Sequence, residues 1–210
     1  MTNLVLIVEG HGDVDAFPPL VGKVGGWLEL PLFTKSPIRT GGWGAIKKPG
    51  GLEKWVGLAV SREGCSRIVI VTDLDDACPV DERASVEDRV MELSSQFGVS
   101  IDICFCMREF ESWLLHSFPE IEEKFKNIDT KKLQKSASFC DIRDAKGLLR
   151  RAMVDGYSES SDQKALASAI FPPTLFNKSR SFRRFVKVIA QKEYVVLQDI
   201  VNKTVSGAGE

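Results

Sequence analysis

The apolar residues in the first half of the chain fall into short runs that alternate with longer amphipathic stretches. Residues 3–8 and 67–71 are almost continuously apolar and rich in β-branched side chains, a pattern typical of strands buried on both faces of a parallel sheet. Two further strands are predicted over residues 30–38 and 99–106, and helices from about Asp13 and over residues 52–61 and 81–97. This alternation favours an α/β fold with a doubly wound, mainly parallel sheet and right-handed crossovers.

The strand pattern ends after Pro119. Helical patterns remain beyond it, at residues 121–125, 145–153, 163–170 and 182–190, separated by Pro, Gly and Ser. We therefore predict an α/β domain over residues 1–117 and a C-terminal helical appendage over residues 118–210, packed on that domain.

The amino-acid composition indicates a globular protein without a disulfide framework. The chain has 210 residues, of which 43% are hydrophobic and 27% charged, as expected of a globular protein with a sizeable core. The formal net charge of -1 means that contact with nucleic acid would need a local basic patch. Its 5 cysteines are odd in number and lack a CxxC pair, which argues against a disulfide framework and a zinc ribbon.

Membrane and export signals are missing from the pattern. No apolar run approaches the ~20 residues of a transmembrane helix, and the first residues lack the charged region and cleavage site of a signal peptide. We expect a cytoplasmic protein with no membrane partner.

Pairs of carboxylates follow three of the predicted strands. Carboxyl ends of parallel strands share one edge of a sheet, where open α/β sheets bind ligands. Carboxylates gathered there repel one another unless a cation or protons intervene, and their hard oxygens suit Mg²⁺ or Mn²⁺. For each pair taken alone, the alternative is a solvated turn or a helix cap. Together they predict a site for one or two metal ions, with the candidate ligands Glu9, Asp13, Asp73, Asp75, Glu109 and Glu111.

Two basic segments are candidates for contacts with phosphate. A glycine-rich segment over residues 39–51 lacks the Gly-Lys-Ser/Thr ending of a P-loop, but it places Trp43 where it could stack on a base. Residues 178–187 contain basic residues and no acidic one. The alternatives are a flexible loop and a solvated helix face. The residues predicted to contact nucleic acid are Lys47, Lys48, Lys178, Arg180, Arg183 and Arg184.

The acidic motifs carry a family resemblance. Val8-Glu9-Gly10 after one strand and Asp73-Leu74-Asp75 after a later one resemble the Toprim domain of topoisomerases, bacterial primases and OLD-type nucleases over roughly residues 3–117. Nearly the whole chain resembles the DUF4276 family of small Toprim-like proteins. Further segments that carry this resemblance are Arg39-Thr-Gly-Gly, Arg108-Glu109-Phe110-Glu111-Ser-Trp113, Gly156-Tyr157-Ser, Asp162-Gln163 and Ser179-Arg180-Ser-Phe182-Arg183-Arg184-Phe185.

The resemblance implies a Toprim-type nuclease, a hydrolase that uses Mg²⁺ or Mn²⁺ on phosphodiester bonds of DNA or RNA. Glu9 would be a catalytic acid/base or metal ligand, Asp73 and Asp75 would be catalytic metal ligands, and Asp13 and Glu111 would help hold a second ion. The residue four positions after Glu9 is Asp rather than the usual Glu, which places the second ion in question.

Proteins of this kind resemble effectors of phage defence that work with a separate ATPase, and this chain has no Walker A motif of its own. A non-catalytic subunit that docks an ATPase or another partner is the main alternative, and a small-substrate phosphatase is a third. The sequence leaves a homodimer open.

Overall fold

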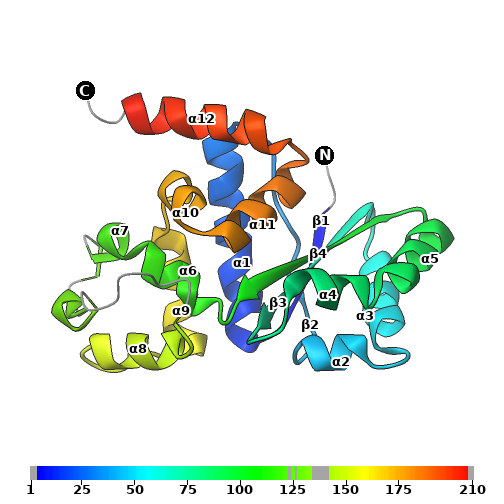
Figure 1. The fold of residues 1–210 in the computed structure, drawn as a ribbon, viewed down its shortest axis with the longest axis horizontal. Helices are drawn as coiled ribbons and strands as arrows, with labels where there is room; N and C mark the ends of the chain where they lie inside the picture. Colours follow the sequence, from blue (N-terminus) through cyan, green and yellow to red (C-terminus); the bar gives the residue numbers. More distant parts are fainter. Residues whose placement is uncertain (1–3, 123, 126, 134–141, 208–210) are drawn as a thin grey trace.

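The computed structural model describes residues 4–122, 124–125, 127–133 and 142–207. Residue 3 of the first predicted strand, residue 123 of one predicted helix and Cys140 lie outside them. The described strands form one sheet in the order β2-β1-β3-β4, in which every neighbouring pair is parallel (Figure 1). The strands are β1 (Leu4–Val8), β2 (Ile38–Arg39), β3 (Arg67–Leu74) and β4 (Ser100–Met107). The predicted α/β fold with a parallel sheet is confirmed.

Alternation along the strands divides the apolar residues between two cores. Val8, Val71 and Cys106 belong to the first core, whereas Ile7 and Ile70 belong to the second, because successive side chains of a strand point to opposite faces. Each central strand is therefore apolar on both sides, which explains its unbroken apolar run.

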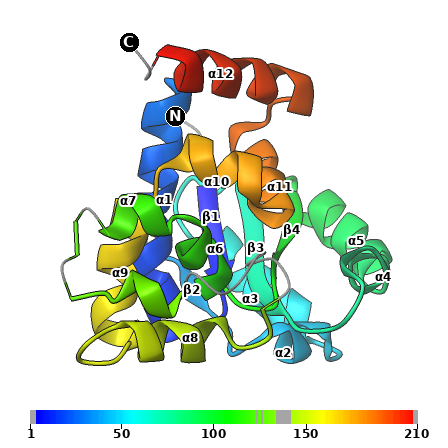
Figure 2. The same ribbon diagram turned by 60° about the vertical axis from the view of Figure 1, so that its left-hand side comes forward.

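Helices cover both faces of the sheet (Figures 1 and 2). The second core is closed by α2 (Trp43–Lys47), α3 (Gly51–Val60) and α5 (Glu87–Phe97), and α4 (Pro79–Ala84) precedes α5. The first core is closed by α1 (His11–Leu28), α6 (Glu111–His116), α7 (Phe118–Glu122), α8 (Ala145–Ala152), α9 (Glu159–Ala169), α10 (Pro172–Lys178), α11 (Arg180–Ala190) and α12 (Tyr194–Gly207), with a 3-10 turn at Thr130–Lys132. No described helix is both long and apolar enough to cross a membrane.

Aromatic side chains at the centre of the first core join its helices to the sheet. Trp113 of α6 is fully buried, and its ring lies 5.1 Å from that of Phe182 and 6.2 Å from that of Phe17. At the start of β3, the buried guanidinium of Arg67 donates hydrogen bonds to the carbonyls of Val188 (2.6 Å) and Ile189 (3.1 Å). These contacts attach α1, α6 and α11 to one another and to β3.

Two predicted elements differ from the structure. The strand predicted over 30–38 is reduced to Ile38–Arg39 and one isolated bridge between Thr34 and Leu4, because Pro31 and Pro37 cannot donate to a ladder. The helix predicted over 81–97 is two helices, because the buried Val86 has a non-helical backbone between them.

Gly12 controls how closely α1 approaches α9. A Cβ at position 12 would overlap the Gln163 side chain and lie 2.8 Å from the carbonyl oxygen of Glu159, whereas a Cβ on Gly22 of the same helix meets no atom within 4 Å. We expect Gly12→Ala to lower the free energy of unfolding by ~1–3 kcal/mol through overpacking. Gly22→Ala should raise it by ~0.4–1 kcal/mol through backbone entropy.

Urea unfolding of the two variants beside the unmodified protein provides the measurement, because the two alanines differ only in the space around them. Equal effects of the two substitutions would show that α1 and α9 are farther apart at Gly12 than the structure indicates.

Candidate functional site

Asp73 lies at the carboxyl end of β3, on the face of the sheet that carries Val71 and the first core. Its Oδ1 accepts a hydrogen bond from the backbone N–H of Phe110 at 2.9 Å. Phe110 follows β4, so this bond draws the segment after β4 over the end of β3. The carboxyl group of Asp73 therefore lies between two neighbouring strand ends.

Glu9 follows the last residue of β1, and its carboxylate lies beside Thr72, whose side chain points to the opposite face of β3 from that of Asp73. Its Oε2 accepts hydrogen bonds from the Thr72 hydroxyl at 2.6 Å and from the backbone N–H of Asp73 at 3.1 Å. Gly42 closes over it with a φ of 106°, and a Cβ there would lie 3.0 Å from the Glu9 carboxylate. Glu9 is thus fixed by β3 and by the glycine-rich segment.

Asp13 lies in the first turn of α1. Its Oδ2 accepts from the backbone N–H of Gly10 at 2.8 Å, which is a helix-capping contact. Its Oδ1 accepts from Gln163 Nε2 of α9 at 2.9 Å. Asp13 can therefore cap α1 and belong to the acidic cluster at the same time.

Glu111 begins α6 and is only 2% exposed. Its Oε1 accepts from the Tyr157 hydroxyl at 3.1 Å and lies 3.7 Å from Lys146 Nζ, which also pairs with Glu159 at 2.9 Å. Glu109, on the same segment, accepts from the backbone N–H of Lys146 at 2.8 Å. Lys146 is the cation of this part of the site.

Burial and neighbouring negative charges raise the pKa of three of these carboxyl groups, Asp73, Asp13 and Glu111. The pKa of Asp73 is held well above its usual range, chiefly by burial and then by the negative charges of Asp13, Glu111 and Glu9, against which Lys146 acts. Burial also raises the pKa of Asp13 and raises that of Glu111 to about 7. Burial opposes the charge on Lys146, yet the neighbouring glutamates raise its pKa. We call Glu9, Asp13, Asp73 and Glu111 the carboxylate cluster.

Asp75 lies apart from this cluster. It is exposed in the turn after β3, and it is not among the charges that shift the pKa of Asp73. Its neighbour Asp76 pairs with Arg108 at 2.5 Å and with Arg143 at 2.6 Å. Arg108 has a φ of 67°, an uncommon backbone for a non-glycine residue. The roles expected of Asp75 and Glu109 stay predictions.

The chemistry of the cluster suits a hard divalent cation, because four carboxylates supply the oxygen ligands that Mg²⁺ and Mn²⁺ prefer. The positions suit it less well. Among the described residues, no three His, Cys, Asp or Glu side chains form a group that could hold a metal ion as they stand. Each clustered carboxylate accepts hydrogen bonds from protein groups instead. A cation would therefore have to replace some of these bonds.

Sequence reasoning missed the partners that α8, α9 and the segment between them supply. Lys146, Tyr157 and Gln163 each bond to a clustered carboxylate, from positions 35 or more residues later in the chain. Tyr157 and Gln163 lie in segments that carry the family resemblance, and nothing else in the sequence indicated that they belong to the site. Lys146 had none.

The glycine-rich segment does not present its aromatic residue to solvent. Trp43 is 8% exposed, its ring lies 4.9 Å from that of Phe105, and its Nε1 donates to Glu82. The prediction that Trp43 stacks on a base was wrong, because α2 turns it into the second core. Lys47 also pairs with Glu82, at 2.7 Å, and Lys48 is exposed.

The basic residues of the C-terminal run have different surroundings. Arg183 donates to the carbonyls of Phe176 and Asn177 at the end of α10, and Lys178 donates to the carbonyl of His116. Arg184 lies 3.6 Å from Asp102, and Arg180 is exposed. Arg183 therefore supports the fold. The two basic segments are also separated, because α2 and α11 pack on opposite faces of the sheet. The six predicted residues do not form one patch.

The raised pKa of Glu111 predicts a pH-dependent stability. Between its ordinary value of 4.5 and about 7, the folded protein keeps a proton that the unfolded chain has released. Stability from this group is therefore greatest below pH 4.5 and is lost as pH rises to about 7. Glu111→Gln removes this titration. The variant's stability relative to the unmodified protein should rise across that window, by on the order of 3 kcal/mol, and then level off.

Thermal unfolding in EDTA at several pH values measures the difference. Glu63→Gln, which changes an exposed glutamate outside the cluster, should shift stability by the same small amount at every pH. A pH-independent difference for Glu111→Gln would contradict the raised pKa.

The chain was compared with family models, with curated proteins and with solved structures. None of the three comparisons found a match. The Toprim and DUF4276 resemblance therefore stays a prediction.

Proposed function

We propose that the carboxylate cluster binds Mg²⁺ or Mn²⁺ and that the protein is a Toprim-type nuclease, which hydrolyses phosphodiester bonds of DNA or RNA. The observation that carries this proposal is the surroundings of Asp73. Three other carboxylates raise its pKa and one cation opposes them. Perturbed groups of this kind gather at functional sites more often than elsewhere.

The balance of charges favours a cation-binding role for the carboxylate cluster over a purely structural one. Lys146 lies within ion-pair distance of Glu111 and Glu159, so its one charge is shared between two carboxylates. Within the described part of the chain, the donors to the remaining clustered carboxylates are neutral. Protons can neutralise part of such a cluster, and a bound divalent cation would relieve the same repulsion while the carboxylates stay ionised.

The residues then take distinct roles. Asp13, Asp73 and Glu111 share one face of the sheet and would hold the cation. Glu9, held on the opposite face by the Thr72 hydroxyl, would accept a proton from an attacking water or act as a further ligand of the cation. When bound, the cation supplies Lewis-acid polarisation of the phosphate and a more acidic water.

A non-catalytic subunit that docks a separate ATPase is the second candidate. It is favoured by the hydrogen bonds that already occupy the clustered carboxylates and by the lack of a preformed metal group among the described residues. Both candidates leave room for a role in phage defence, since the ATPase expected from the family resemblance would be a separate chain.

Asp73→Asn tests the metal and the nuclease together. The asparagine keeps an oxygen to accept from Phe110 but removes the charge. Cleavage of plasmid and single-stranded DNA or RNA in Mg²⁺ or Mn²⁺ should fall to background. Stabilisation by Mn²⁺ should also be lost, and for the unmodified protein it should reach ~2.7 kcal/mol at 100 times the dissociation constant.

Asp88→Asn is the matched control, because Asp88 is exposed on α5 and outside the cluster. It should retain cleavage and metal stabilisation. Asp75→Asn in the same assays decides whether that exposed residue belongs to the site. Undiminished cleavage by highly purified Asp73→Asn, or no stabilisation of the unmodified protein by Mn²⁺, would favour the docking subunit instead.

A further inference from the structure

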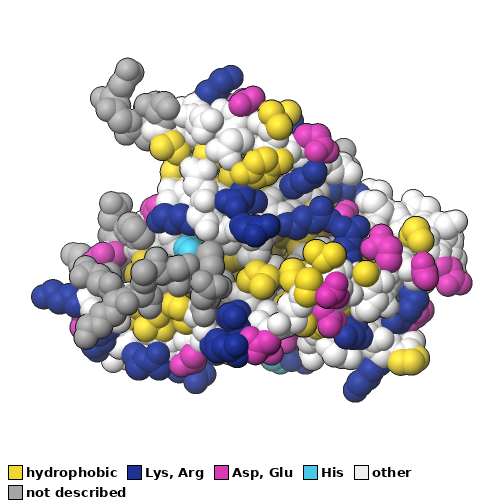
Figure 3. Space-filling view, viewed as in Figure 1, with side chains coloured by type: hydrophobic (Ala, Val, Ile, Leu, Met, Phe, Trp, Pro, Cys, Tyr) yellow, Lys and Arg dark blue, Asp and Glu magenta, His cyan; other side chains and the backbone are white. Residues whose placement is uncertain are grey.

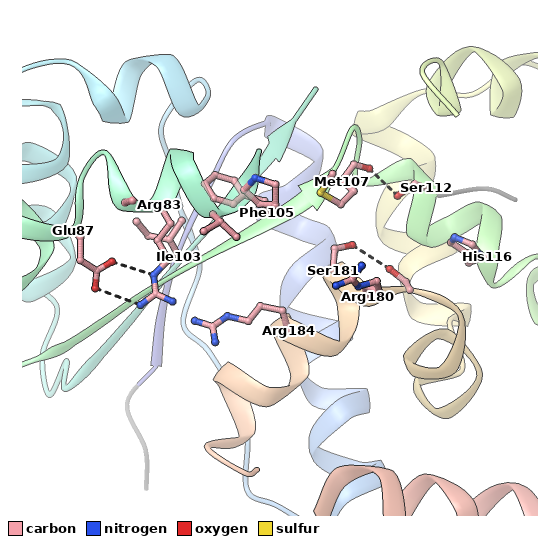
Figure 4. A pocket seen from close by; sticks show the side chains of 14 residues that line it. Arg83, Glu87, Ile103, Phe105, Met107, Ser112, His116, Arg180, Ser181 and Arg184 are labelled. Atoms are coloured by element: carbon pink, nitrogen blue, oxygen red, sulfur yellow. Dashed lines mark hydrogen bonds and ion pairs between the residues drawn. The ribbon is translucent and has the colours of Figure 1, made fainter. Parts of the chain in front are cut away.

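A long groove follows the outer edge of β4. It encloses about 960 Å³ and runs between α4 and the start of α11, with Ile103, Phe105 and Met107 along β4 (Figure 4). No residue of the carboxylate cluster lines it. The groove is therefore a feature separate from the proposed nuclease site.

The edge of β4 that faces this groove has unpaired backbone groups. The N–H groups of Ser100 and Arg108 donate to the carbonyls of Ser66, just before β3, and Leu74, the last residue of β3. Because the direction of backbone groups alternates along a strand, the N–H and C=O groups of Ile103 and Phe105 point away from β3. Among the described residues, β4 pairs with β3 alone. The outward N–H and C=O groups of Ile103 and Phe105 have no hydrogen-bond partner among these residues. Such an edge is a template for another strand.

The two walls of the groove differ in charge. On the α11 side, Arg180 is exposed and has no recorded partner in the described part of the chain, and Arg184 is loosely paired with Asp102 at 3.6 Å. On the α4 side, Arg83 is paired with Glu87, and Val80 is 72% exposed. Figure 3 shows a row of Lys and Arg side chains beside an apolar area in the middle of this face.

These features favour an extended acidic peptide over other occupants. A second copy of the chain would have to place its own α4 and α11 walls, with their arginines, against those of the first. A nucleic acid would use the arginines but not the outward N–H and C=O groups beside apolar side chains. An extended peptide uses both, since its backbone pairs with β4 while alternate side chains face the two walls.

We propose that the groove binds an extended peptide segment of a partner protein, which adds to β4 as a fifth strand and places acidic side chains against Arg180 and Arg184. Apolar side chains of the same segment would lie against Val80 and Met107. This inference does not rest on nuclease activity, so either proposal can fail without the other.

The probe is the peptide Glu-Val-Glu-Val-Glu-Val-Glu-amide with fluorescein on its N-terminus, tested on the full chain. Binding should slow amide hydrogen exchange at Ile103 and Phe105, measured by NMR, and leave the already paired amides of Cys104 and Cys106 unchanged. A peptide with proline in place of the central valine should bind much more weakly, because it cannot continue a ladder.

Charge reversal tests the α11 wall. Arg180→Glu with Arg184→Glu should weaken binding of the acidic peptide at least ~10-fold and strengthen binding of the corresponding Lys-Val peptide. Arg150→Glu is the matched control, because Arg150 is exposed on α8 and outside the groove. Circular dichroism and thermal unfolding confirm that each variant is folded.

Three outcomes would overturn the proposal. The first is no protection of Ile103 and Phe105 at saturating or millimolar peptide. The second is a single-stranded oligonucleotide that displaces the peptide and loses affinity in the charge-reversed variant, which would make the groove a nucleic-acid site. The third is protection of these amides in the free protein that increases with protein concentration, which would make a second copy the occupant.

Discussion

A parallel sheet brings the carboxyl ends of its strands to one edge, and in this protein those ends carry acidic residues. The rest of the site is arranged around that constraint. Thr72 and the backbone of Asp73 hold Glu9, Gln163 holds Asp13, and Tyr157 with Lys146 holds Glu111. The compensating groups come from β3 and from helices far along the chain. The edge therefore depends on the C-terminal helices as much as on the strands.

The sequence was most informative where a pattern has one physical solution. Continuous apolar runs rich in β-branched residues require burial on two faces, which predicted β1 and β3. The carboxyl ends of parallel strands meet at one edge of the sheet, which predicted the approach of Glu9, Asp73 and Glu111. Asp75 was expected beside Asp73 but lies apart from the cluster. Side chains two positions apart share a face only while the chain stays extended, and β3 ends at Leu74. The groups that hold the carboxylates were beyond local reasoning, since nothing near Lys146 indicates what it will contact.

Surface roles were harder to predict than the core. Trp43 occurs among glycines and lysines, a composition typical of an exposed loop, but a short helix there turns its ring into the second core. The basic run of α11 looks uniform in sequence. In three dimensions Arg183 bonds to the end of α10, whereas Arg180 and Arg184 line the groove. Helical periodicity separates the buried Phe182 and Phe185 from the arginines, but it does not say what each arginine meets.

The hydrogen bond between Gln163 and Asp13 spans 150 residues of sequence, and that from Arg67 to Ile189 spans 122. Such separations have a consequence for the order in which the chain acquires its structure during synthesis. The N-terminal strands and α1 leave the ribosome before the helices that close their first face exist. Until α9 and α11 have been made, that apolar face stays uncovered and Asp13 lacks its donor Gln163. Completion of the fold must therefore wait for the last quarter of the chain, and until then the emerging half is open to aggregation or to chaperones.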